Sequence, residues 1–106
     1  MFPLGYNNPM IELFRTEEFS KWVIGIKDVR LQAAVFDRLA RFEQGNFGDT
    51  KPVGENISEA RIHYGAGYRM YFLKKGNTIV VMLGGGDKSS QDRDINKAKE
   101  LAKKWR

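Results

Sequence analysis

The chain of 106 residues has no cysteine and a single histidine, His63. The absence of cysteine excludes a disulfide scaffold, a cysteine zinc site and a cysteine nucleophile. One histidine gives no support to a Ser-His-Asp triad. Since no His, Asp and Glu residues occur at ligand spacing, the sequence predicts neither a metal site nor another cofactor.

Long apolar runs are missing as well. The longest one, residues 79–83, is far too short to span a bilayer. Residues 1–9 have neither the basic start nor the apolar stretch of a signal peptide. We therefore expect a cytoplasmic protein that makes no contact with a membrane.

Positive charge, in contrast, is concentrated in the second half of the chain. Residues 60–106 contain 11 Lys and Arg against 4 Asp and Glu, whereas residues 1–59 contain 7 against 9. A basic half favours a polyanionic partner, either nucleic acid or an acidic protein segment. The alternative is a basic surface that serves solubility alone, and composition leaves both interpretations open.

The length predicts one domain, preceded by a short arm. Residues 1–9 contain two prolines, a glycine and two asparagines before any periodic pattern begins. This composition is typical of a loose N-terminal arm. The domain itself is expected over residues 10–106.

The first half of the domain predicts a strand, two helices and a loop. A strand-like segment covers residues 10–14, and apolar residues at helical spacing follow Thr16 and Asp28, which can cap two helices. The second helix ends at Gly45, and the two helices are expected to form an antiparallel hairpin. Turn-forming residues fill 45–56, which we interpret as a loop.

The second half predicts three strands and a helix. The strands are expected over residues 57–64, 68–75 and 78–84. The glycine run 84–86 ends the last strand, and Ser89 or Ser90 caps a final helix. The order is therefore β-α-α-β-β-β-α, an α+β domain with a helical hairpin on one face of a mostly antiparallel sheet.

The hairpin between the first two of these strands has two contrasting faces. A three-residue turn over 65–67 places Ile62 opposite Met70 and Ala60 opposite Phe72. One face is then apolar, while the other collects Glu59, Arg61, His63, Arg69, Tyr71 and Leu73. Shifting the register by one residue would mix the two sets, so the apolar pattern selects this arrangement of faces.

The polar face has two interpretations. Arginine binds phosphate through two parallel hydrogen bonds and stabilises charge on a transferring phosphorus, while Tyr and His stack on bases for about 1–3 kcal/mol each. The alternative is a solvated face on which Glu59 bridges an arginine. The nearby segment 84–90 lacks the spacing of an ATP-binding loop. Its Lys88 and helix start suit a generic anion site or an ordinary turn.

Two blocks of sequence resemble one known family. Residues 59–72, EARIHYGAGYRMYF, resemble the E-L-R-[IV]-x-x-G-x-G-Y-R-[VM]-Y-F signature of the phage-derived Gp49-like, HigB-type addiction module killer proteins, with Ala60 in place of the usual leucine. Residues 84–95 are similar to that family's G-G-x-K-x-x-Q-x-x-D-I block, and residues 11–19 are similar to its opening. The likeness covers residues 10–106.

This resemblance implies a compact domain of the RelE/ParE toxin superfamily and the toxin role in a type II toxin–antitoxin pair. The implied activity is a metal-independent, ribosome-dependent mRNA endoribonuclease in which a ribose 2′-hydroxyl attacks the adjacent phosphate. The implied partners are mRNA on the ribosome and a cognate antitoxin of helix-turn-helix type. The alternatives are a ParE-like inhibitor of DNA gyrase that acts through protein contacts, and an inactive member that only binds antitoxin.

The resemblance also assigns expected roles to six residues. By position in the motifs, the expected catalytic residues at the scissile phosphate are Arg61, Arg69 and Lys88. The expected RNA contacts are His63, Tyr71 and Lys74, and His63 and Tyr71 are also candidates for acid/base roles.

Overall fold

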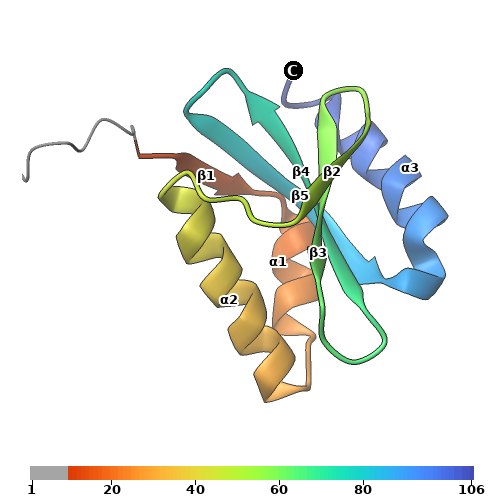
Figure 1. Ribbon diagram of the computed structural model, residues 1–106. Helices are drawn as coiled ribbons and strands as arrows, with labels where there is room; N and C mark the ends of the chain where they lie inside the picture. Colours follow the sequence, from red (N-terminus) through yellow and green to blue (C-terminus); the bar gives the residue numbers. More distant parts are fainter. Residues whose placement is uncertain (1–9) are drawn as a thin grey trace, which may run out of the picture.

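A computed structural model of the protein describes residues 10–106, so the arm expected over residues 1–9 lies outside the described residues. This part contains a five-stranded mixed sheet and three α-helices, which confirms the α+β class (Figure 1). The elements are β1 (Glu12–Arg15), α1 (Glu17–Ile24), α2 (Val29–Glu43), β2 (Thr50–Gly54), β3 (Ile57–Ile62), β4 (Tyr68–Lys75), β5 (Ile79–Asp87), the 3-10 turn η1 (Lys88–Ser90) and α3 (Gln91–Ala102). None of the helices within residues 10–106 is long and apolar enough to cross a membrane.

The sheet has the strand order β1-β5-β4-β3-β2. β1 is parallel to β5, and every other neighbouring pair is antiparallel. Strand β5 therefore lies between β1 and β4. This arrangement joins the beginning of the domain to a strand near its end.

Strand β2 is absent from the sequence prediction, which treated residues 45–56 as a loop and was wrong there. Thr50 lies opposite Ala60 of β3, and Lys51 lies opposite Glu59. Glu55 and Asn56 form the tight connection to β3 with φ values of 56° and 64°. Turn-forming residues on both sides thus concealed a strand of five residues, whose proline is tolerated because β2 is an edge strand.

The register of the β3–β4 hairpin also differs from the expectation. Ile62 lies opposite Tyr68 and Ala60 lies opposite Met70, because the connection covers residues 63–67 and not three residues. The pairing is shifted by two positions. An even shift leaves every side chain on its predicted face, so the division into an apolar and a polar face is confirmed.

Helices cover both faces of the sheet (Figure 1). α1 and α2 pack on one face, as predicted, around a buried apolar cluster that includes Phe19, Val23, Leu31, Val35, Leu39, Phe42, Met70 and Phe72. α3 packs on the opposite face over Ile57, Tyr71, Leu73, Val81, Leu83, Ala98 and Ala102. The face expected to be polar is therefore partly a second core.

The glycine run does not end β5, which continues to Asp87 and so contradicts the expected boundary. A Cβ atom on Gly85 would lie 2.5 Å from the ring of Trp22, and one on Gly86 would clash with the carboxylate of Asp94. These two glycines admit α1 on one side of the strand and α3 on the other. They serve close packing, which is a recognised reason for glycine inside a strand.

Candidate functional site

Four of the predicted site residues lie at one end of the sheet, around the turn between β3 and β4. Arg61 of β3 and Arg69 of β4 are direct partners across the ladder, and His63 follows β3. The backbone N–H of Lys88 donates a hydrogen bond to the carbonyl of Gly67 in the turn, at 3.3 Å. We call Arg61, His63, Arg69 and Lys88 the basic cluster.

Asp49 holds two members of the basic cluster together at the surface. Its Oδ1 accepts a hydrogen bond from Arg61 Nη2 at 2.9 Å, and its Oδ2 lies 2.7 Å from His63 Nε2. The hydrogen bond from Arg61, followed by that from His63, lowers the pKa of Asp49, and the carboxylate raises the pKa of Arg61. We call Asp49, Arg61 and His63 the Asp49 group. Sequence reasoning missed Asp49 because it was assigned to a loop.

Arg69 belongs to a second, buried group. Its Nε lies 3.5 Å from Oε2 of Glu59, whose side chain is 3% exposed. Gln91, at the start of α3, donates a hydrogen bond from Nε2 to Glu59 Oε1 at 2.9 Å. The arrangement in which Glu59 bridges an arginine is therefore present, but beneath α3 and not on a solvated face.

Tyr71 completes this Glu59 group, which we define as Glu59, Arg69, Tyr71 and Gln91. Tyr71 lies directly opposite Glu59 in the ladder and is fully buried. Its hydroxyl has no hydrogen-bond partner among the described residues. Burial, and then the negative charge of Glu59, raises the pKa of Tyr71 well above its ordinary range. A buried ring cannot stack on a base in this conformation, so the geometry does not support the expected RNA contact.

Lys74 also lies away from the basic cluster. It is opposite Val80, towards the far end of β4, and its ammonium lies 4.2 Å from the ring centroid of Phe47. Phe47 packs against the apolar cluster beneath α1 and α2, on the other face of the sheet. The structure therefore gives Lys74 a cation–π contact and does not bring it near the other expected site residues.

Arg38 of α2 holds the backbone of the Asp49 group in place. Its guanidinium donates to the carbonyl oxygens of Phe47, Asp49 and Arg61 at 2.7–3.2 Å. Burial lowers the pKa of Arg38. The helix thereby fixes the backbone of the two residues that carry the exposed ion pair. A sequence signal was available, because position 38 lies on the inner side of α2, between the buried Val35 and Phe42.

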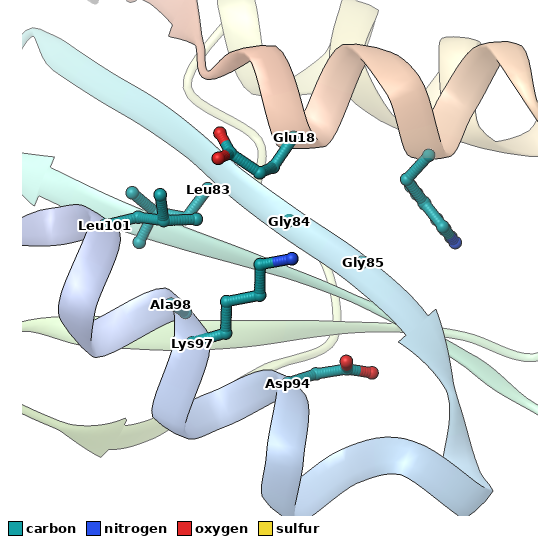
Figure 2. Close-up of a pocket in the computed structure, with 9 residues that line it drawn as sticks. Glu18, Leu83, Gly84, Gly85, Asp94, Lys97, Ala98 and Leu101 are labelled. Atoms are coloured by element: carbon teal, nitrogen blue, oxygen red, sulfur yellow. The ribbon is translucent and has the colours of Figure 1, made fainter.

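A small hollow of about 130 Å³ opens at the edge of β5 (Figure 2). The pairing of β1 with β5 ends at Met82, so β1 does not cover the segment from Leu83 onward. Glu18 of α1 lines one side of the hollow, and Asp94 and Lys97 of α3 line the other. No member of the basic cluster lines it. Within residues 10–106, no three His, Asp or Glu side chains gather in a way that could hold a metal ion.

Comparison with known proteins gives a sequence relative and structural neighbours. No family model matches the sequence. The chain is 44% identical over 92 residues to an uncharacterized protein of Haemophilus influenzae. The aligned residues cover 87% of this chain and 93% of that protein. The structure of the present chain is similar to that of a chain in the RelBE2 toxin–antitoxin complex of Mycobacterium tuberculosis, with a TM-score of 0.58 and 20% sequence identity. The similar region covers 76% of the present chain and 99% of the RelBE2 chain. This similarity confirms that the fold is RelE-like.

Proposed function

The chain belongs to the same family as the Haemophilus influenzae protein, and we propose that it is the toxin of a type II toxin–antitoxin pair. The RelE-like fold and the two sequence blocks that resemble HigB-type killer proteins support this assignment. The proposed activity is ribosome-dependent cleavage of mRNA in the cytoplasm. The proposed inhibitor is a helix-turn-helix antitoxin.

The observation that carries the proposal is the geometry of the Asp49 group. Arg61 and His63 are held side by side by one carboxylate, and both side chains remain accessible, at 37% and 76% exposure. An accessible guanidinium beside an imidazole provides a phosphate ligand and a proton-transfer group within one surface. The backbone of Lys88 lies at the same end of the sheet, where its exposed side chain adds an ammonium group.

In the proposed reaction the ribose 2′-hydroxyl attacks the adjacent phosphorus. The 2′-hydroxyl gives up its proton as the O2′–P bond forms, and the P–O5′ bond breaks. The products are a 2′,3′-cyclic phosphate and a 5′-hydroxyl, whose proton balances the one lost from O2′. Arg61 donates hydrogen bonds to the phosphate oxygens on which negative charge develops. His63 takes part in proton transfer, and Lys88 orients the phosphate. Arg69 is only 13% exposed beside Glu59, so we assign it a positioning role.

The proposal is tested by mapping mRNA 5′ ends after a short induction of the chain without antitoxin. New ends within translated reading frames are expected from the unaltered protein. The Arg61→Gln variant should produce at least about 100-fold fewer, because it removes the charged donor from the phosphate. Arg15→Gln, an equal change of charge at an exposed position on β1, is the matched control and should cleave normally.

Other outcomes identify the alternatives. Growth arrest with intact mRNA and a DNA-damage response would contradict the nuclease and indicate a gyrase inhibitor. An absence of arrest, with antitoxin binding retained, would indicate an inactive member of the family. Equal cleavage by the Arg61→Gln variant would remove the Asp49 group from the mechanism.

A further inference from the structure

Helix α2 carries a second apolar face, which points away from the sheet. Val29 is 77% exposed and Phe36 is 47% exposed, and Ala33 and Ala40 are exposed between and beyond them. These four residues occur at i, i+4, i+7 and i+11, the spacing of a continuous stripe along one side of a helix. We call Val29, Ala33, Phe36 and Ala40 the outer stripe.

The outer stripe is separate from the face that packs on the sheet. The buried side of α2 consists of Leu31, Val35, Leu39 and Phe42. Large apolar side chains left in solvent at helical spacing are typical of an interaction surface. Among the described residues, no other segment covers the stripe.

The order of side chains along the outer stripe is complementary to itself. A second α2 that runs antiparallel, centred midway between Ala33 and Phe36, places Phe36 opposite Ala33 of the second copy. The same arrangement places Val29 opposite Ala40 of the second copy. Each large side chain thus meets a small one, which lets two helices approach closely without leaving a void. The contact is isologous, as in most homodimers.

Charges beside the stripe select the same orientation. Arg30 and Asp37 are both exposed and lie on one flank of the outer stripe. In the antiparallel arrangement this flank faces its own counterpart, so Arg30 lies near Asp37 of the second copy, twice in the dimer. Asp37 is already paired with Arg41 at 3.1 Å, but an exposed pair at i,i+4 spacing contributes little and can exchange partners. In a parallel arrangement this flank would face the opposite flank of the second copy, so Arg30 and Asp37 would not meet.

From this self-complementarity we propose that the outer stripe of α2 is the interface of a two-fold symmetric homodimer. One helix from each copy supplies the contact, so the interface lies at the small end of the range for specific complexes. We therefore expect a weak dimer that forms at high protein concentration. The proposal does not depend on the proposed function.

Sedimentation equilibrium of the full chain, from about 5 µM to about 1 mM, tests the proposal. The average mass should rise from 12.2 kDa towards twice that value. Phe36→Glu places a charge at the centre of the interface and should weaken association at least about tenfold. Lys104→Gln, with the same change in net charge on an exposed residue beyond α3, should associate like the unaltered chain.

A charge exchange tests the orientation. Arg30→Asp and Asp37→Arg should each weaken the dimer, because each brings like charges together, and the double variant should restore it. Both positions are exposed, so these substitutions should leave the fold intact. A monomer at every concentration would overturn the proposal and leave the stripe to an amphipathic helix of another protein. A dimer unaffected by Phe36→Glu would also overturn it.

Discussion

Two arginines that face each other across the β3–β4 ladder are held by carboxylates in very different surroundings. Arg61 pairs with Asp49 at 2.9 Å, and more than a third of each side chain is exposed. Arg69 pairs with Glu59 at 3.5 Å, and both side chains are largely buried beneath the start of α3. One pair is short and accessible, whereas the other is longer and enclosed.

The difference separates binding from stability. An exposed ion pair contributes little to folding and can give up its partner to an incoming anion. A buried pair gains little over apolar packing, but the loss of one member leaves an uncompensated charge in the interior. The Asp49 group is thus suited to contact a ligand, and the Glu59 group is suited to hold β3, β4 and α3 together.

The largest effect on stability is expected from Arg69→Ala. The change leaves the buried Glu59 carboxylate without its cation, so the free energy of unfolding should fall by about 3 kcal/mol. Urea denaturation measures this loss. In a Glu59→Gln background the same substitution should cost much less, because no charge is then stranded. An equal cost in both backgrounds would contradict the ion-pair explanation.

Tyr71→Phe should produce a smaller effect of the opposite sign. It removes a buried hydroxyl that has no hydrogen-bond partner among residues 10–106, so the chain should gain about 1 kcal/mol of stability. The midpoint of urea unfolding reports this gain. A clear loss of stability would mean that the hydroxyl makes a hydrogen bond in solution and would weaken the contrast between the two groups.

Arg61→Gln should change stability less than either of these substitutions. The pair that it breaks is accessible, so water can solvate the Asp49 carboxylate after the change. The melting temperature should stay close to that of the unaltered chain, whereas RNA cleavage should be lost. A drop as large as that of Arg69→Ala would show that the Asp49 group is structural as well.

The smallest expected effect is on the titration of Asp49 at acid pH. Hydrogen bonds from Arg61 and His63 lower the pKa of Asp49 below its ordinary value of 3.8. A carboxylate with a lowered pKa stabilises the fold above its unfolded pKa and loses that contribution as the pH falls through its folded pKa. The carbon-13 shift of the Asp49 carboxyl should therefore titrate below pH 3.8, and in Arg61→Gln the midpoint should rise. An unchanged midpoint would remove Arg61 as the main cause.

The helical hairpin and the face that it covers could be predicted from the sequence. Alternating apolar residues in β3 and β4 fix the two faces, and an error of two residues in the turn does not disturb them. The position of α3 could not be predicted in the same way. Its covering of Tyr71 and Glu59 follows from long-range packing, in which Gly86 makes room for Asp94 of the helix.

The candidate site was predictable only where one hairpin determines it. Arg61 and Arg69 share a face because they are partners on adjacent strands of that hairpin, and His63 follows directly after β3. Asp49, which directly precedes the missed strand β2, contacts Arg61 and His63, and Arg38 of α2 donates a hydrogen bond to the carbonyl of Arg61. Both contacts join segments that are distant in sequence, and neither leaves a local pattern.

The parallel pairing of β1 with β5 also bears on how the chain acquires its fold during synthesis. Thr16, which caps α1, donates its hydroxyl hydrogen to the carbonyl of Leu83, 67 residues later, and its backbone N–H to that of Met82. Strand β1 thus remains without its neighbour until about three-quarters of residues 10–106 have been translated, because its partners are Ile79 to Met82. Pairings between such distant segments form slowly. A nascent chain that stops before β5 lacks the strand that lies between β1 and β4, so folding of the whole sheet is delayed until β5 has been made.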